Sequence, residues 1–274
     1  MGNIVNPAFY VVNAGCRRRA ERGCSQRKGD GSIQSVMGDC QPMTRFQVDR
    51  SLDAISGWLL PPRCVLCGRP GQRPCLDLCA GCEADLPPDP CALLSGPHPI
   101  ERSLAAFAYA FPVDHLVQLL KYRGNLAVGR VLGALLARSV QAQELHQDVD
   151  WVVPVPLHPG RHADRGFNQS AEIARRVARV LGRETCEGAV GRVRDTRPQV
   201  GLRPEERRRN IAGAFVASAR FRGRRVAVVD DVLTTGATVG AVAAALRQAG
   251  AISVDVWCVA RAVHQERIDL SPRG

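Results

Sequence analysis

An apolar segment that ends in two adjacent acids constrains the fold of this chain more than any other part of its sequence. RRVAVVDD (224–231) has the apolar content of a buried strand, and LTTGAT (233–238) follows it as a loop. Periodic apolar residues then predict a helix from about residue 239 to 249, and SVDVWCVA (253–260) is typical of another strand. A strand, a helix and a strand, with both strands continuously apolar, indicate a parallel sheet that is covered on both faces. We therefore predict an α/β fold for this half of the chain.

Two further regions extend this pattern toward the N-terminus. DWVVPVP (150–156) predicts a short buried strand, and a turn-rich stretch leads from it to a helix from about Asn168 to Leu181. From about residue 104 to 142, apolar residues recur at helical spacing and indicate two helices joined at Gly124.

The first 50 residues differ from the rest of the chain. Gly, Asn, Ser and Arg alternate there without a helical or strand period, and the positive charges follow the apolar stretch instead of preceding it as in a signal peptide. We expect residues 1–50 to be a disordered tail or an over-called start, with Met43 or Met37 as the true first residue. Because no apolar run reaches the roughly 18 to 20 residues of a membrane span, we expect no membrane insertion.

The chain has 11 cysteines, and two CxxC pairs among them are separated by 11 residues. This spacing is typical of tetrahedral zinc, and four thiolates would complete the coordination shell, so the metal would be structural. The module spans residues 58–91. Disulfides, redox chemistry and a module without metal are the alternatives, and Cys75 either replaces the third ligand or is a spare thiol. The four candidate ligands are Cys64, Cys67, Cys79 and Cys82.

Asp230 and Asp231 stand at the carboxyl end of the predicted strand, which is the edge where open α/β sheets bind ligands. The loop after them leads into a helix N-terminus, whose free N–H groups and positive dipole end favour an anion. Because the two acids would repel a phosphate bound to that loop, we expect them to face sugar hydroxyls. The loop residues suited to wrap a phosphate monoester are Thr234, Thr235, Gly236, Ala237 and Thr238.

This stretch resembles the phosphoribosyl pyrophosphate (PRPP) signature of type I phosphoribosyltransferases. Together with VPVPLHPGRHADRGFNQS (153–170), RPQVGL (197–202), ERRRNIAGAF (206–215), the cysteine module and KYRG, the chain is similar to the ComF competence family over roughly residues 58–262. The resemblance implies a type I phosphoribosyltransferase fold, a Rossmann-like parallel sheet, at residues 100–265, with an N-terminal zinc-binding module.

The resemblance also implies a role for each matching residue. Asp230 and Asp231 match the acids that hold the ribose hydroxyls, where they can stabilise positive charge on the sugar, and the loop from Thr234 to Thr238 matches the 5′-phosphate site. Mg²⁺ would be held mainly by oxygens of the ligand. The segment that matches the pyrophosphate loop includes Pro156, Leu157, His158 and Arg161, with His158 as loop structure rather than a catalytic group.

Five further positions are candidate contacts to PRPP: Lys121, Arg165, Asn168, Arg207 and Arg208. Lys121, one of two lysines among 37 basic residues, contacts pyrophosphate or another acidic partner, or is a helix-surface lysine. Asn168 caps a helix, contacts phosphate or does both. Arg207 and Arg208 lie in a charged stretch, residues 192–210, which is either a lid that excludes water or, for its arginines, a solvated surface.

Two classes of function remain. One is a cytoplasmic PRPP-dependent transferase with an unknown acceptor, and type I relatives of that kind are often homodimers. The other is a non-catalytic module that binds single-stranded DNA or competence-machinery proteins during DNA uptake, which the net charge of +11 favours. Stacking on single strands needs exposed aromatics, and we expect most of the four near a basic segment to be core residues. These four are Phe107, Tyr109, Phe111 and Tyr122. A regulator that binds no ligand conflicts with the complete acid and loop pattern.

Overall fold

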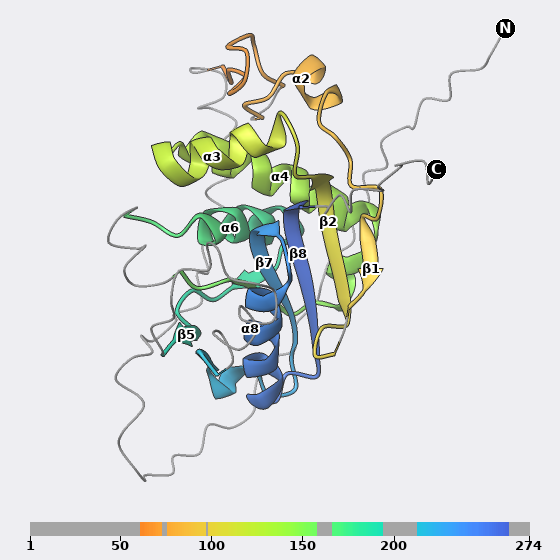
Figure 1. Cartoon of the computed structure of the whole chain (residues 1–274), viewed down its shortest axis with the longest axis vertical. Coiled ribbons are helices and arrows are strands. Elements are labelled where there is room, and N and C mark those ends of the chain that lie inside the picture. Colours follow the sequence, from red (N-terminus) through yellow and green to blue (C-terminus); the bar gives the residue numbers. More distant parts are fainter. Residues whose placement is uncertain (1–60, 73–75, 97, 158–165, 194–212, 263–274) are drawn as a thin grey trace, which may run out of the picture. The chain divides into compact units, whose positions relative to one another are not determined.

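The computed structural model describes residues 61–72, 76–96, 98–157, 166–193 and 213–262 (Figure 1). All of them belong to one unit, residues 35–274, and the other unit, residues 1–34, lies outside the described residues. The expected tail at residues 1–50 therefore also lies outside them.

A six-stranded sheet forms the centre of the described fold, with the strand order β1-β2-β8-β7-β3-β4 (Figure 1). Four neighbouring pairs are parallel, and only β1 runs antiparallel to its neighbour β2. The strands are β1 (Leu93–Ser95), β2 (Arg102–Ala108), β3 (Trp151–Pro154), β4 (Glu184–Thr185), β7 (Arg225–Leu233) and β8 (Ser253–Arg261). A separate antiparallel pair is formed by β5 (Val190–Arg192) and β6 (Phe215–Ala217).

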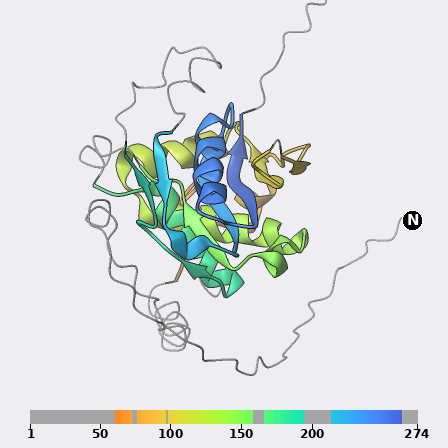
Figure 2. The ribbon, with the colours of Figure 1, turned by 90° about the horizontal axis from the view of Figure 1, so that it is seen from below.

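Helices cover both faces of the sheet (Figures 1 and 2). One apolar core joins the sheet to α3 (Val113–Arg123), α4 (Leu126–Ala142) and α6 (Gln169–Leu181), and a second joins it to α8 (Ala237–Gln248). α4 and α6 approach closely at Gly133, where an added Cβ would lie 2.7 Å from Cβ of Arg176. The short helices are α2 (Ala80–Ala84), η1 (Leu145–Asp148) and η2 (Ala219–Phe221). None of the helices in these ranges is long and apolar enough to cross a bilayer.

Most predicted elements are confirmed. The predicted strands correspond to β3, β7 and β8, and the predicted helices to α3, α4, α6 and α8. The helix pair is joined at Gly124, which adopts a left-handed conformation with φ of 60° and accordingly ends α3. Asn168 caps α6 as expected, because its side chain accepts a hydrogen bond from the backbone N–H of Ser170.

The expectation of helical structure from about residue 104 was wrong, because residues 102–108 form strand β2. Its residues are largely buried between β1 and β8. A short apolar run has no period that separates a buried strand from a buried helix, so only pairing with β8 decides its conformation.

The expectation that most of the four aromatics near the basic segment are core residues was also wrong. Phe111 and Tyr122 are 76% and 74% exposed, and Tyr109 is 36% exposed. Only Phe107 packs partly against the core. Periodicity identifies which face of a helix is apolar, but it does not reveal that Phe111 precedes α3 and Tyr122 faces away from the sheet.

The cysteine-containing segment packs on α4. Arg130 pairs with Asp77 at 3.1 Å, and Arg138 pairs with Glu83 at 2.8 Å. Cys64 and Leu78 belong to the same apolar core as α3 and α4. Because both ion pairs are partly exposed, we attribute the docking mainly to apolar burial.

Candidate functional site

The candidate site lies at the carboxyl edge of the parallel strands. β3 and β7 are paired with Pro154 opposite Val229, and the N–H of Val155 donates to the carbonyl of Val229 at 2.9 Å. The segment after β3, with Pro156 and Leu157, therefore emerges beside the end of β7, where Asp230 and Asp231 are located. In parallel α/β sheets this edge is the usual position of a ligand site.

Asp230 is held from two sides. Ser170 Oγ donates to Asp230 Oδ1 at 2.9 Å, and the backbone N–H of Asp231 donates to the same oxygen at 2.9 Å. Burial and the neighbouring Asp231 carboxylate raise the pKa of Asp230 to about 7, against the lowering effect of these hydrogen bonds. The Asp230 carboxyl group therefore keeps its proton to a higher pH than an ordinary aspartate does.

Asp231 has a different environment. It is only 4% exposed, and Lys121 Nζ of α3 lies 3.0 Å from Asp231 Oδ1. Its second oxygen, Oδ2, is buried and has no hydrogen-bond partner in the described part of the chain. A buried carboxylate oxygen without a donor is costly, so this atom is suited to accept a hydrogen bond from a ligand.

The loop after β7 has the geometry of an anion site. Gly236 adopts a left-handed conformation with φ of 72°, and α8 begins at the next residue. Thr235 Oγ1 accepts from the N–H of Ala237 at 3.5 Å, while Thr234 is exposed. The N–H groups of the first turn of α8 point to the same end of the helix, where the dipole favours negative charge.

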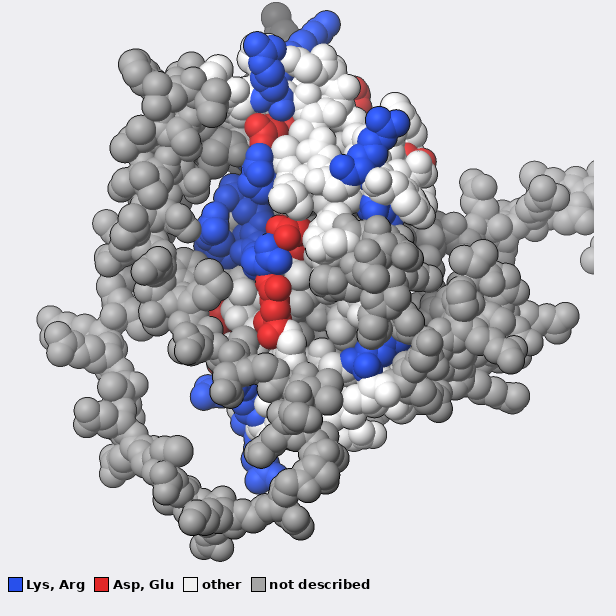
Figure 3. All heavy atoms as spheres, turned by 90° about the vertical axis from the view of Figure 1, so that its left-hand side faces the viewer, with Lys and Arg blue, Asp and Glu red and all other residues white. Residues whose placement is uncertain are grey.

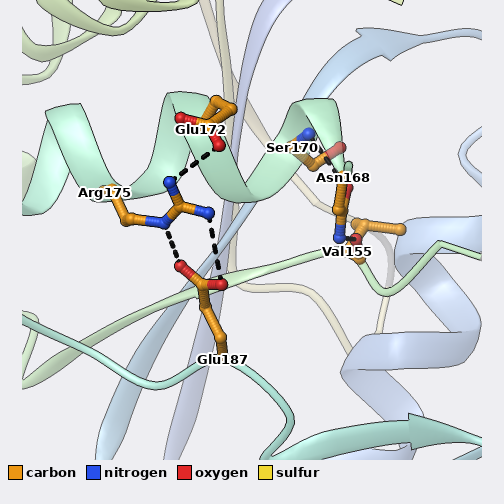
Figure 4. Close-up of polar contacts among 6 residues, drawn as sticks. All are labelled: Val155, Asn168, Ser170, Glu172, Arg175 and Glu187. Atoms are coloured by element: carbon orange, nitrogen blue, oxygen red, sulfur yellow. Dashed lines mark hydrogen bonds and ion pairs between the residues drawn. The ribbon is translucent and has the colours of Figure 1, made fainter. Parts of the chain in front are cut away.

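The start of α6 is bound to the segment that follows β3 (Figure 4) and, through Ser170, to Asp230. Asn168 Nδ2 donates to the carbonyl of Val155 at 3.0 Å, and its Oδ1 accepts from the N–H of Ser170 at 3.0 Å. Both polar groups of Asn168 are thus used inside the protein, which accounts for its capping role. Ser170, which holds Asp230, was not among the predicted site residues; its only sequence signal is its place in the first turn of a helix that starts at this edge.

Arg175 fixes the outer side of α6, as Figure 4 shows. Its guanidinium binds Glu172 on the same helix and Glu187 in the turn between β4 and β5. These contacts tie α6 to the segment that precedes residues 194–212.

Several predicted site residues are not described. His158, Arg161 and Arg165, together with Arg207 and Arg208 and most of the expected lid at residues 192–210, lie outside the described residues. Among the described ones, the fold brings together Lys121, Asn168, Pro156, Leu157 and the two acids at one edge of the sheet.

The four predicted metal-ligating cysteines form one cluster. The Sγ atoms of Cys64, Cys67, Cys79 and Cys82 all lie within 4.8 Å of one another, and those of Cys67 and Cys79 are 3.6 Å apart. In tetrahedral zinc thiolate sites the sulfurs are about 3.8 Å apart, as follows from Zn–S bonds of about 2.3 Å. All four thiols are free, so the described structure contains no disulfide among them.

The surroundings of Cys64 fit a thiolate. Burial would raise the pKa of Cys64, but hydrogen bonds from the backbone of Cys79, Cys67 and Leu66 outweigh it and lower the pKa to about 6. The residue after Cys67, Gly68, has φ of 72°, as a tight cysteine turn requires. Cys79 occupies the position for which Cys75 was the alternative, and Cys75 itself lies outside the described residues.

A cavity of about 820 Å³ lies beside the phosphate-type loop but does not include the acids. α8, the β1–β2 connection and loop residues Thr234 to Ala237 line it, and most of its surface is apolar. The carboxyl groups of Asp230 and Asp231 therefore belong to a different part of the sheet edge.

The sheet, the acid pair and the loop before α8 define a type I phosphoribosyltransferase fold. A family described as phosphoribosyl transferase domain matches residues 168–271. A DNA utilization protein of Salmonella typhi, YhgH, is 35% identical over 214 residues, which cover 76% of this chain and 92% of that protein. Competence protein F of Haemophilus influenzae is 36% identical over 160 residues, covering 56% and 70% respectively. The chain belongs to the ComF family of competence and DNA-utilisation proteins.

One solved structure was also similar. It is described as the allosteric regulatory enzyme of purine biosynthesis, is 27% identical, covers 47% of this chain and 25% of its own, and has a TM-score of 0.31.

The raised pKa of Asp230 predicts a pH-dependent contribution to stability. Its pKa is about 7 in the folded protein and about 4 in the unfolded chain, so the folded state binds the extra proton between these values. The Asp230 contribution to the free energy of unfolding should therefore be largest below about pH 4, decrease as the pH rises toward 7 and level off above it. Urea unfolding from pH 5 to 8 should show this decrease as the difference between wild type and Asp230→Asn.

Asp85→Asn is the matched control, because Asp85 is an exposed aspartate outside the sheet. Its difference from wild type should stay flat over the same pH range. If the free energy of unfolding of wild type relative to Asp230→Asn increased from pH 5 to 7, this would contradict the raised pKa of Asp230.

Proposed function

We propose that the protein binds PRPP and transfers its phosphoribosyl group to an acceptor, with release of pyrophosphate. The observation that supports this most directly is the unpaired, buried Oδ2 of Asp231, two residues before the loop that leads into α8. A ribose hydroxyl can donate to this oxygen while the 5′-phosphate of the same molecule binds the loop.

The two acids divide the work on the ribose. Lys121 compensates the charge of Asp231, which accepts from one hydroxyl. Asp230, with its pKa near 7, can accept from the neighbouring hydroxyl or donate to it, depending on its proton. Two adjacent carboxyl groups suit a vicinal diol, because its hydroxyls both donate and accept hydrogen bonds.

The transfer is a displacement at the anomeric carbon. The bond from this carbon to the acceptor forms, the bond to the pyrophosphate oxygen breaks with its electron pair leaving on pyrophosphate, and the acceptor loses a proton. The sugar becomes positive in the transition state, and the acid pair stabilises that charge. Mg²⁺, when bound, neutralises charge on the leaving pyrophosphate.

Magnesium fits this site only if oxygens of the bound PRPP are its main partners. Of the oxygens of the two acids, Asp230 Oδ1 and Asp231 Oδ1 are already bound by protein donors. Among the described residues, the four cysteines are the only group of three or more side chains with metal-ligand geometry. Mg²⁺ keeps several waters and binds phosphate oxygens readily, so a site with few protein ligands is consistent with its chemistry.

The binding half of the proposal predicts a Mg²⁺-dependent affinity for PRPP that requires the acid pair. In Asp230→Asn/Asp231→Asn, PRPP should bind about 100-fold more weakly, because hydrogen bonds to two charged or partly charged acceptors are lost. Calorimetric titration with and without Mg²⁺ measures this. Asp85→Asn/Asp148→Asn removes the same charge from exposed positions and should bind like wild type.

The absence of PRPP binding by metal-replete wild type would overturn the proposal. Binding without pyrophosphate release in the presence of candidate acceptors would restrict the protein to a PRPP-binding role.

We further propose that the four cysteines hold a structural Zn²⁺. The support is the sulfur geometry and the presence of four cysteine ligands, which would complete a tetrahedral shell. Such an ion would hold together a segment that has few buried residues of its own, since none of the residues of α2 is buried.

Purified protein should therefore contain one zinc per chain. Cys79→Ser should lose the metal and lower the melting temperature by about 10 °C, since a metal site is worth several kcal/mol. Metal analysis and thermal unfolding measure both effects. Cys91→Ser, at an exposed free thiol outside the cluster, should change neither. Metal-free protein with paired, oxidised cysteines would contradict the zinc assignment.

The exposure of Phe111 and Tyr122 favours a second function, the binding of single-stranded nucleic acid. They lie next to the two ends of α3, and Arg123 follows Tyr122. Figure 3 shows lysine and arginine side chains gathered on one face of the molecule, with acidic side chains among them. Exposed aromatics provide the stacking that the basic sequence alone lacks. Relatives named for DNA utilisation and competence are consistent with this proposal.

A fluorescent oligothymidylate should therefore bind with an affinity that decreases steeply with salt. Phe111→Ala/Tyr122→Ala should weaken this binding at least about 10-fold, because each stacked base contributes about 1–3 kcal/mol. Anisotropy titrations measure the affinity. Leu126→Ala, at an exposed but aliphatic residue, is the control and should bind like wild type. Equal affinity of wild type and the aromatic double variant would exclude this surface.

A further inference from the structure

We propose that Lys121 is a positioning residue that acts on the ribose through Asp231, rather than a ligand of the pyrophosphate group. This inference rests on the proposed function and assigns a separate role within it. It follows from the placement of Lys121 on α3, the burial of Asp231 and the unequal partners of the two Asp231 oxygens.

The helical phase of α3 directs Lys121 toward the sheet. Val117 and Leu120 are fully buried, and Lys121 lies four residues after Val117, on the same face of the helix. The next two residues, Tyr122 and Arg123, are exposed. α3 then ends at Gly124, so Lys121 stands in a last helical turn whose inner side is fixed by apolar packing.

The contact that results is short and largely shielded from water. Lys121 Nζ lies 3.0 Å from Asp231 Oδ1, and the two side chains are 21% and 6% exposed. Removing one partner of such a pair leaves the other as an uncompensated buried charge, which is strongly unfavourable. Lys121 therefore stabilises the carboxylate form of Asp231 in the absence of any ligand.

Lys121 also fixes the direction of the Asp231 carboxylate. With Oδ1 held by the ammonium group, Oδ2 is the Asp231 oxygen that has no hydrogen-bond partner among the described residues. Asp230 is also held at its Oδ1, by Ser170 and by the N–H of Asp231, but the ion pair with Lys121 is made by Asp231. The ion pair thus leaves one oriented acceptor for a hydroxyl group.

Other charged groups near the pair are few among the described residues. Asp230 is the adjacent carboxyl group on β7, and Cys258 on β8 pairs in register with Asp230. Burial and the two acids raise the pKa of the Cys258 thiol well above its usual range, so it is neutral. Among the described residues, Lys121 is accordingly the cation in direct ionic contact with the acid pair.

The two possible roles of Lys121 predict different ligand specificities. If Lys121 binds the pyrophosphate group, it contributes to the affinity for PRPP and for inorganic pyrophosphate, but not to the affinity for ribose 5-phosphate. If Lys121 positions Asp231, it contributes equally to the affinities for PRPP and ribose 5-phosphate, and it does not change the affinity for pyrophosphate. Ribose 5-phosphate contains the hydroxyls and the 5′-phosphate, but it has no pyrophosphate group.

The experiment is calorimetric titration of the zinc-loaded full-length protein with PRPP, ribose 5-phosphate and inorganic pyrophosphate, each with Mg²⁺. Lys121→Met keeps the length of the apolar stem and removes the charge. It should weaken PRPP and ribose 5-phosphate by the same factor, about 10-fold or more, and leave pyrophosphate affinity unchanged. In an Asp231→Asn background, Lys121→Met should cause no further loss for ribose 5-phosphate.

Two controls make the result specific. Lys121→Arg should restore ribose 5-phosphate affinity to within a few-fold of wild type, because it restores the cation. Arg123→Met removes an exposed charge from the same helical turn and should bind all three ligands like wild type. If Lys121→Met does not fold, as thermal unfolding would reveal, Lys121→Gln replaces it.

Loss of pyrophosphate affinity in Lys121→Met, with ribose 5-phosphate affinity retained, would overturn the inference and assign Lys121 to the pyrophosphate site. The inference would also be overturned if the double variant Lys121→Met/Asp231→Asn lost as much affinity for ribose 5-phosphate as the two single variants together. If wild type binds neither PRPP nor ribose 5-phosphate, the proposed function fails and the inference fails with it. If wild type binds these ligands but the variants show one of the two contrary results above, the inference fails and the proposed function stands.

Discussion

Two adjacent carboxyl groups at the end of β7 are the constraint on which the functional edge of this structure depends. Asp230 and Asp231 stand where burial and mutual repulsion both penalise their charge. The fold compensates them with different partners, a serine hydroxyl from α6 and a lysine ammonium from α3. The two helices are thereby fixed at the same edge of the sheet, and each acid has its own partner.

The cysteine-containing segment is connected to this edge through shared packing. Its ion pairs and apolar side chains contact α4, and α4 is joined to α3 through the left-handed turn at Gly124. α3 in turn supplies Lys121 to Asp231. A metal that organises the four thiols would therefore stabilise the helices that hold the acid pair, although no open metal position would take part in the chemistry.

Local sequence patterns predicted the central part of the fold correctly. β7, the loop and α8 are consecutive in the chain. The apolar strand, Gly236 and the start of the helix therefore form one continuous sequence pattern. The cysteine cluster was predictable for the same reason, since one CxxC turn presents two sulfurs together. The short apolar strand β2 was not, because only its pairing with β8 distinguishes it from a helix.

The acid pair, the anion-type loop and the four thiols could be predicted from the sequence, because each depends on residues that are close along the chain. The contacts of Lys121 with Asp231 and of Ser170 with Asp230, and the exposure of Phe111 and Tyr122, become visible only in the folded structure. These features depend on the phase and packing of helices whose partners lie 60 or more residues away. Helical period identifies an apolar face, but the packing of that face against the sheet decides which polar side chains reach the site.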